Sequence, residues 1–317
     1  MKKIFSLIVA LILTSLSVAC DQAESTESTE SADFTASSEA VSSASTAEND
    51  NFLERATGRI KTESYKNGGK MGDTDGPAFA VYSKVGYNGA SVELDLSNAE
   101  INTVLPDNRY INAYSFLGID VYQGAYWQNC ADAGLCWSGT KGGWHLFYNI
   151  YETLNENTAS WYESRKILPK NAKYRLTLKL TEDNYAVLTV EGITNGFKDS
   201  IKIEIKGAKK DGSNTAFLFN SALDYPPDTK LDSSGKPSED FAMITLANSD
   251  KGLYFRNLHS ENGKLFKNGE EVKWTEALTA ATSIWPDKAI SGFDYSPTEV
   301  YLFDGSEFLI NFDMNRN

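Results

Sequence analysis

The aromatic residues between positions 114 and 162 are the side chains of this chain best suited to hold a ligand. Twelve of the Tyr, Phe and Trp residues of the 317-residue chain fall in this stretch. Sugars present apolar C–H faces with hydroxyl rims, so flat rings beside amides and carboxylates suit a glycan site. The residues expected to line such a site are Asp120, Tyr122, Trp127, Trp137, His145, Asn149 and Tyr151.

Side-chain alternation predicts which of these rings share a face. In an extended segment from Trp144, one face carries Trp144, Leu146, Tyr148 and Ile150, and the other carries His145, Phe147, Asn149 and Tyr151. In the segment 114–123, one side carries Leu117, Ile119 and Val121, and the other carries Phe116, Asp120 and Tyr122. We expect the two more polar sets to line one groove and the remaining rings to be core.

Cys130 and Cys136 lie between Trp127 and Trp137. In an exported protein this spacing predicts a disulfide that stiffens a loop presenting two indoles. A zinc site is not expected, because the whole chain has only three Cys and two His, and these lack the spacing of zinc ligands.

A calcium site is a weaker candidate. Asp73-Thr74-Asp75-Gly76 has the start of a calcium loop, with Asp73 and Asp75 as ligands, but the later acidic positions of an EF-hand are missing. A plain turn explains the same residues. No other cofactor is expected.

The segments that must position these residues read as β-strands. Residues 174–180 alternate apolar and polar side chains, a short turn at 182–184 follows, and residues 185–191 and 200–206 continue a three-strand meander. Asn-Gly or Asp-Gly pairs start at residues 67, 75, 88, 195, 211, 262, 268 and 304 and predict hairpin turns. Further strands are expected at 78–83, 90–97, 114–123, 144–152, 160–165, 215–223, 241–246, 253–259, 300–303 and 307–312.

One helix is expected, at residues 275–284, before Trp285-Pro286. A dozen or more strands without an internal linker predict an all-β fold, in which two antiparallel sheets pack face to face as a single β-sandwich domain over residues 51–317.

The N-terminal fifty residues predict export and a tether. Lys2 and Lys3, the apolar run 4–16 and small residues before Cys20 indicate a signal peptide over residues 1–19. The segment 16–20 resembles the lipobox of bacterial lipoproteins, which implies lipidation of Cys20 and a place in the bacterial cell envelope outside the cytoplasm. Cleavage after Ala19 without lipid is the alternative. Residues 20–50 are rich in Ser, Thr and acids, and we expect a disordered tether.

The strand order, the aromatic middle and the stretch 161–192 resemble the concanavalin-like jelly rolls of lectins, glucanases and polysaccharide lyases. The resemblance covers about residues 55–315 and implies a bent sheet whose concave face holds glycan. Glu93-Leu94-Asp95 resembles the start of a glucanase motif, but Asn98 stands where its last glutamate belongs.

Catalysis is an alternative to binding. No G-x-S-x-G, P-loop, H-E-x-x-H or dinucleotide fingerprint is present. A lyase needs a base and a cation or amide beside a uronate carboxylate, and Tyr254, Arg256 and His259 supply these types. A glycosidase needs two carboxyls across a cleft. Both His145 and His259 can equally be structural.

The sequence therefore favours a lipid-anchored β-sandwich that binds a polysaccharide or oligosaccharide. The alternatives are a polysaccharide lyase, a glycoside hydrolase, or a structural or protein-binding surface lipoprotein. A nucleic-acid partner is not expected, because the formal net charge is -13 and phosphate binding needs clustered Lys and Arg. The membrane is expected to be reached only through the N-terminal lipid.

Overall fold

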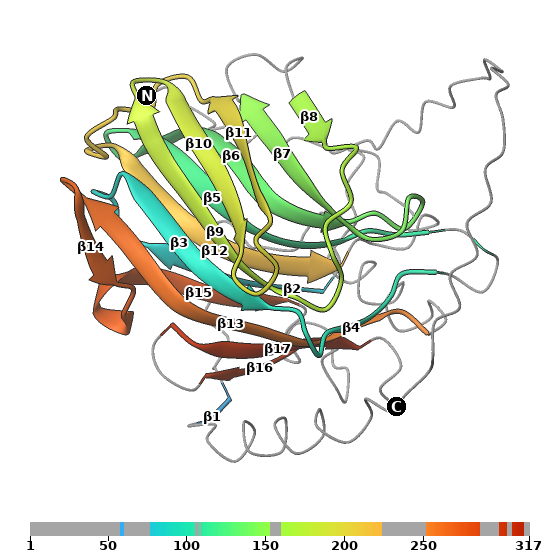
Figure 1. The fold of residues 1–317 in the computed structure, drawn as a ribbon. Coiled ribbons are helices and arrows are strands. Elements are labelled where there is room, and N and C mark those ends of the chain that lie inside the picture. The colour runs from blue at the N-terminus through green and yellow to red at the C-terminus, as the bar shows by residue number, and fades with distance from the viewer. Residues whose placement is uncertain are drawn as a thin grey trace, which may run out of the picture. The chain divides into compact units, whose positions relative to one another are not determined.

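The computed structural model describes residues 58–59, 77–104, 108, 110–152, 160–223, 252–285, 298–302 and 306–313. In these ranges the chain forms two antiparallel β-sheets and one short 3-10 turn (Figure 1). The predicted all-β sandwich is confirmed. The signal peptide, Cys20, the tether, Asp73, Asp75 and the strand expected at 241–246 all lie outside the described residues. Among the described residues, no helix is long and apolar enough to cross a membrane.

The first sheet has seven strands. In spatial order they are β15 (Thr279–Trp285), β2 (Ala78–Ser83), β12 (Thr215–Leu223), β5 (Ala113–Gln123), β6 (Tyr126–Trp137), β7 (Trp144–Glu152) and β8 (Ser160–Glu163). The aromatic stretch of the sequence therefore becomes four neighbouring strands, β5 to β8, at one side of this sheet.

The second sheet has ten strands. Eight lie in the order β1 (Gly58–Arg59), β16 (Thr298–Leu302), β17 (Phe308–Asp313), β13 (Tyr254–Lys267), β3 (Gly89–Asp95), β9 (Lys173–Glu182), β10 (Tyr185–Gly192) and β11 (Lys198–Glu204). Two short strands, β4 (Glu100–Asn102) and β14 (Glu270–Lys273), also pair with β13.

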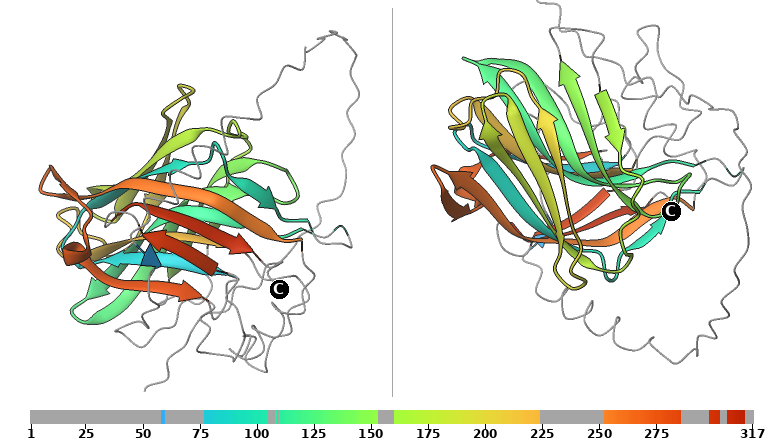
Figure 2. Two further views of the ribbon diagram at one scale, coloured as in Figure 1. Left: turned by 90° about the horizontal axis from the view of Figure 1, so that it is seen from below. Right: turned by 45° about the horizontal axis from the view of Figure 1, so that its top comes forward.

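The core lies between the two sheets, which Figure 2 shows as two layers from two further directions. The alternation predicted for residues 174–180 is confirmed, because Tyr174, Leu176 and Leu178 are fully buried in it. Leu117 and Ile119 of β5 enter the same core from the seven-stranded sheet. The predicted meander is also confirmed as β9, β10 and β11, paired in sequence order.

The predicted helix at 275–284 is wrong. Only Glu276–Leu278 form a 3-10 turn, and the rest is strand β15, which pairs with β2. Ile284 enters the core from β15. The ladder to β2 also gives the backbone N–H and C=O groups hydrogen-bond partners, whereas an isolated short helix is only marginally stable in water. Pairing with the edge of the sheet therefore overrides the weak local helix preference of this segment.

The Asn-Gly pairs have two different structural roles. Asn268 and Gly269 both have positive φ, at 53° and 85°, and form the predicted hairpin turn between β13 and β14. Asn262-Gly263 does not make a turn. Asn262 has φ 53° inside β13, where the register to β3 shifts between Glu261 and Lys264, so this pair forms a β-bulge. The pairs that start at 67, 75 and 304 include residues outside the described ranges.

The predicted disulfide between Cys130 and Cys136 is wrong. Both residues lie on one continuous strand, β6, six positions apart, so their Cα atoms are separated by roughly 20 Å. A disulfide needs Cα atoms within about 7 Å. Neither residue forms a disulfide, and Cys136 is buried. The expected loop between Trp127 and Trp137 is instead part of a twelve-residue strand.

Candidate functional site

The outer face of the seven-stranded sheet is the side turned away from the ten-stranded sheet. On β5, Leu117, Ile119 and Val121 point into the core between the sheets, so Phe116, Asp120 and Tyr122 lie on the outer face by alternation. This is the division expected from the sequence. The outer face has its own apolar cluster of Phe116, Cys136, Phe147 and Leu218, against which Tyr82 and Tyr114 pack.

Strand register brings outer-face residues from six strands into one row. Opposite partners lead in turn from β2 through β12, β5, β6 and β7 to β8. The row consists of Tyr82, Leu218, Gly118, Asp132, Asn149 and Trp161. Because neighbouring strands lie about 4.8 Å apart, the part of the row from β5 to β8 spans roughly 14 Å.

Asp120 is held by two aromatic side chains on this face. The indole Nε1 of Trp127 donates a hydrogen bond to Asp120 Oδ1 at 3.1 Å, and the Tyr122 hydroxyl donates to Oδ2 at 3.4 Å. Burial raises the pKa of Asp120 to about 6, although both hydrogen bonds act in the opposite direction. Three residues that the sequence predicted to bind ligand are therefore in direct contact.

Asp132 provides a second carboxylate beside Asp120. Asp132 is opposite Gly118 and Asp120 is opposite Cys130, so the two acids are diagonal neighbours on paired strands. A Cβ added to Gly118 would lie 2.7 Å from Asp132 Oδ1, so the carboxylate occupies the space that the missing side chain leaves. Burial, followed by the charges of Asp120 and Asp132, raises the pKa of Tyr82 well above its ordinary value.

Two indoles on this face remain open to solvent. Trp127 is 42% exposed and Trp161 is 47% exposed. Trp161 stacks on Phe147 of the apolar cluster, with ring centroids 5.2 Å apart and planes 28° apart. Trp161 and Asp132 were not among the predicted binding residues. Alternation along the expected strand 160–165 identifies Trp161, and alternation along 130–136 identifies Asp132. The predicted disulfide instead favoured a loop at 130–136.

Asn149 lies on the expected face of β7, but the other predicted residues of this strand do not add to the site. Asn149 lies opposite both Asp132 and Trp161 and is 4% exposed. His145 is only 1% exposed, and its Nδ1 lies 2.8 Å from the Ser164 carbonyl oxygen, which makes it a structural side chain. Tyr151 pairs with Cys130 in the ladder, and its side chain is outside the described part of the structure.

Trp137 lies on the opposite face of β6 from Trp127. Its ring packs edge-on against Trp144, a core residue, with centroids 5.6 Å apart. The Lys170 ammonium lies 4.7 Å from the centroid of the same ring. Trp137 therefore belongs to the rim of the core and does not form one platform with Trp127.

The predicted lyase residues are in the other sheet. Tyr254, Arg256 and His259 all lie on β13. Arg256 is bound by Asp313, with Nη2 and Oδ2 2.6 Å apart, and its guanidinium lies 4.2 Å over the Tyr254 ring. A bulge at Asn257, where φ is 57°, separates these two residues from His259. Tyr254 and Arg256 thus contact each other but not His259, and all three residues lie in the ten-stranded sheet, apart from the aromatic face.

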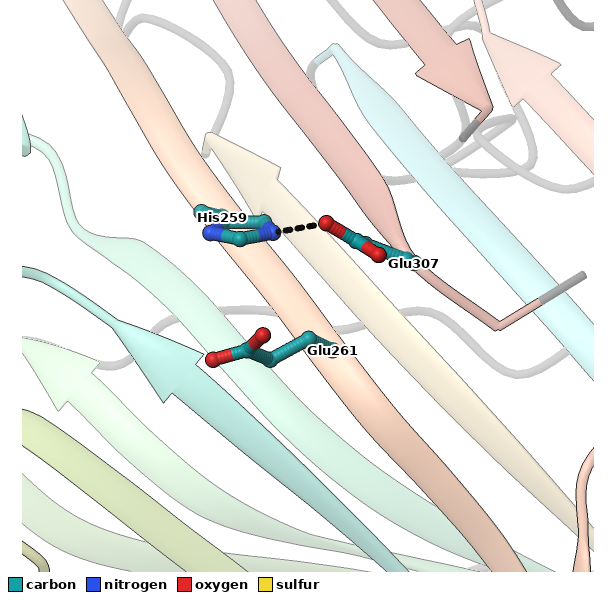
Figure 3. A group of neighbouring side chains, drawn as sticks. All are labelled: His259, Glu261 and Glu307. Atoms are coloured by element: carbon teal, nitrogen blue, oxygen red, sulfur yellow. Dashed lines mark hydrogen bonds and ion pairs between the residues drawn. The ribbon is translucent and has the colours of Figure 1, made fainter. Parts of the chain in front are cut away.

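His259 belongs to a cluster with Glu261 and Glu307 (Figure 3). The imidazole Nε2 donates to Glu307 Oε1 at 3.1 Å, and one ligand atom from each of the three residues lies within 4.8 Å of the others. Burial lowers the pKa of His259 against the raising effect of Glu261 and Glu307. Imidazole and carboxylates can hold a divalent cation.

Lys173 already supplies a cation to this cluster. Its ammonium contacts Glu261 and lies 3.3 Å from Glu93 Oε2. A metal ion would have to displace or tolerate this charge, which weighs against a metal centre. A separate depression of about 290 Å³ is lined by Tyr87, Lys267, Asn268, Glu270, Val272 and Leu278, none of which was a predicted site residue.

Comparison with known proteins gives only distant structural likeness. No protein-family model and no curated protein matches the chain. The crystal structure of scytalido-glutamic peptidase with a transition state analog inhibitor superposes with TM-score 0.44 and 12% identity, covering 75% of this chain and 98% of that chain. SCP-B, a member of the eqolisin family of peptidases, gives 0.42 and 13%, covering 75% and 98%. Aspergilloglutamic peptidase from Aspergillus niger gives 0.36 and 13%, covering 63% and 98%. Likeness at this level does not reveal function, which has to be inferred from the residues of this chain.

Proposed function

We propose that the outer face of the seven-stranded sheet binds carbohydrate. The observation that carries this proposal is that two solvent-exposed indoles, Trp127 and Trp161, share one sheet face with the carboxyls of Asp120 and Asp132. Indole faces pack against the C–H surfaces of sugar rings, while carboxylates and amides bind the hydroxyl rims.

Charge favours a neutral or cationic glycan over a polyanionic one. The Asp120 carboxyl is hydrogen-bonded to Trp127, and Asp132 lies beside it on the same face. A uronate or sulfate placed there would be repelled. The lyase alternative, which requires a uronate, is therefore less well supported than binding of an uncharged chain.

We also propose that the protein acts as a lipoprotein of the bacterial cell envelope. The support is the basic start at Lys2 and Lys3, the apolar run and Cys20 at the end of a lipobox-like segment. A lipid on Cys20 would anchor the chain, and residues 21–50 would hold the sandwich away from the bilayer. Two antiparallel sheets packed face to face are also the architecture of the concanavalin-like jelly rolls, and we propose that the domain is related to them.

The test is gel retardation of the full chain by a panel of neutral and charged polysaccharides. We expect at least one neutral polysaccharide to retard the protein. Trp161→Ala and Trp127→Ala should each weaken retardation by about tenfold or more, because each removes an aromatic contact surface.

Matched controls come from the adjacent residues. Tyr162 is 40% exposed and stacks on Tyr148, which packs against the core, so Tyr162→Ala removes an open ring from the other side of β8. Tyr126→Ala removes a ring that is 77% exposed beside Trp127. The proposal predicts retardation close to wild type for both controls. If no glycan retards the protein, or if Trp161→Ala and Tyr162→Ala behave alike, a structural or protein-binding role replaces it.

A further inference from the structure

We propose that the outer face also hydrolyses the glycan that it binds, with Asp120 as the general acid and Asp132 as the general base. This inference rests on the proposed function, because it needs a sugar chain lying across β5 and β6. It assigns chemistry to two residues that aromatic binding alone does not explain.

The strand register sets the separation of the two acids. They are diagonal neighbours on paired strands, which places their Cβ atoms roughly 7 Å apart on one face. Glycosidases use carboxyl pairs about 5 to 9.5 Å apart. Asp120 and Asp132 lie on inner strands of the seven-stranded sheet, so the backbone fixes their separation more firmly than loops would.

The two acids also differ in their surroundings, as an acid and a base must. Several titratable or polar groups face Asp120: Tyr122 from its own strand, Tyr82 from β2, and Trp127, Cys130 and Asp132 from β6. On β12 its direct partner is Ala216, which carries no charge. No cation lies among these groups, and burial raises the pKa of Asp120 to about 6, so the carboxyl carries a proton in mildly acidic solution.

Asp132 is placed to act on water from the neighbouring position. Its carboxylate extends over Gly118, the one residue of the row without a side chain. In the row, Asp132 lies between Gly118 on β5 and Asn149 on β7. The Asp132 carboxylate and the Leu218 side chain fill the space where a Cβ of Gly118 would lie, so the carboxylate lies directly against the sheet. A sugar ring that packs on Trp161 or Trp127 would bring a glycosidic oxygen to this part of the face.

The reaction consumes one water molecule for each bond broken. The Asp120 carboxyl gives its proton to the glycosidic oxygen while the bond from that oxygen to the anomeric carbon breaks. The Asp132 carboxylate takes one proton from a water molecule, whose oxygen forms the new bond to the same carbon. The products are a hemiacetal and an alcohol, and the two carboxyls return to their starting states by proton exchange with solvent.

The test measures new reducing ends at pH 5 from whichever polysaccharide retards the full chain. We expect slow but measurable release by the wild type. Asp132→Asn and Asp120→Asn should each reduce the rate by about a hundredfold or more, the usual contribution of one acid or base. Asp132→Asn should keep its retardation, since an amide still binds hydroxyls. The rate should fall as pH rises above about 6, where Asp120 loses its proton.

Glu182→Gln, in an exposed ion pair of the ten-stranded sheet, is the control and should leave the rate unchanged. Retardation without reducing ends overturns the hydrolysis inference and leaves the binding proposal intact. Absence of retardation overturns the binding proposal itself. A wild-type rate in Asp132→Asn, or cleavage of a protein substrate such as casein without cleavage of any glycan, also overturns the inference.

Discussion

Asp120 is the residue on which the chemistry of the outer face depends most. Its carboxyl receives one hydrogen bond from an indole and one from a phenol, and both donors are themselves part of the aromatic surface. The residue therefore has two effects: it fixes the orientation of Trp127, and it places a weakly acidic carboxyl beside Asp132. The first effect bears on the proposed binding and the second on the proposed hydrolysis.

The raised pKa of Asp120 predicts a pH-dependent cost in stability. The folded protein holds this proton more tightly than the unfolded chain, so the contribution of Asp120 to the free energy of unfolding is lost as pH rises from about 4 through about 6. Asp120→Asn cannot ionise. Between pH 4 and 7 its stability should rise relative to wild type by about 1 to 3 kcal/mol. Urea unfolding at several pH values measures this; a flat or opposite slope would contradict it.

At the scale of the strands, alternation predicted the sheets well where polar and apolar residues take turns. Residues 174–191 form β9 and β10 with the expected inward and outward sides because one face of each meets the core. Strand β6 was missed because its inward residues are small, Ala131 and Ala133, and because two cysteines suggested a loop. The local pattern could not show that β5 and β7 would pair with it on both sides.

The continuity of β6 predicts that Cys130 and Cys136 are not linked by a disulfide. Alkylation of the unfolded, unreduced protein with iodoacetamide, followed by peptide mass spectrometry, should label both Cys130 and Cys136. In the folded protein labelling should be slow, because burial, together with the charges of Asp132 and Asp120, raises the pKa of the Cys130 thiol. A peptide in which the two cysteines are linked before reduction would show that β6 is not a continuous strand.

In the ten-stranded sheet, Glu93 joins β3 to β9 and β13. Arg175 Nη2 and Asn262 Nδ2 donate to its two oxygens at 2.6 and 2.9 Å. Burial alone would raise the pKa of Glu93, but these hydrogen bonds and the charge of Lys173 outweigh it and lower the pKa. Its stabilisation is therefore present above its ordinary pKa of 4.5 and is lost as pH falls below that value.

Glu93→Gln should lower the free energy of unfolding at pH 7 by about 1 to 3 kcal/mol, and by less at pH 3, because the wild-type carboxyl is then protonated. The control Glu182→Gln breaks an exposed pair with Lys202 and should cost at most about 0.5 kcal/mol. Thermal or urea unfolding of both variants measures the difference. Equal losses in the two variants would mean that Glu93 is no more important than a surface acid.

At the scale of the whole molecule, the sandwich explains how one short stretch of sequence provides a surface of open rings and carboxyls. The inner faces of the two sheets supply the core, so the outer face of β5 to β8 can carry exposed rings and acids without a loss of packing. The sequence predicted the two-sheet class and the shared face of Asp120, Tyr122, Trp127 and Asn149. It could not predict which rings meet across strands, since partner choice among β5, β6, β7 and β8 depends on contacts far apart in the chain.

The proposed anchor gives a prediction for the full chain. In a bacterial host, the wild-type protein should fractionate with membranes, and mass spectrometry should find lipid on Cys20 after removal of residues 1–19. Cys20→Ser removes the lipidation site and should release the protein to the soluble extracytoplasmic fraction. A wild-type chain that is cleaved after Ala19 and soluble would contradict the anchor and would leave the sandwich and its outer face unaffected.

Hydrogen–deuterium exchange of the full chain, with and without a retarding polysaccharide, tests the central claim most directly. With a carbohydrate site on the outer face, we expect slower exchange in peptides from β5 to β8, residues 113–152 and 160–163, and no change in β9 to β11. Slower exchange confined to the ten-stranded sheet, or none in β5 to β8 under conditions where the gel shows retardation, would contradict a carbohydrate site on the outer face.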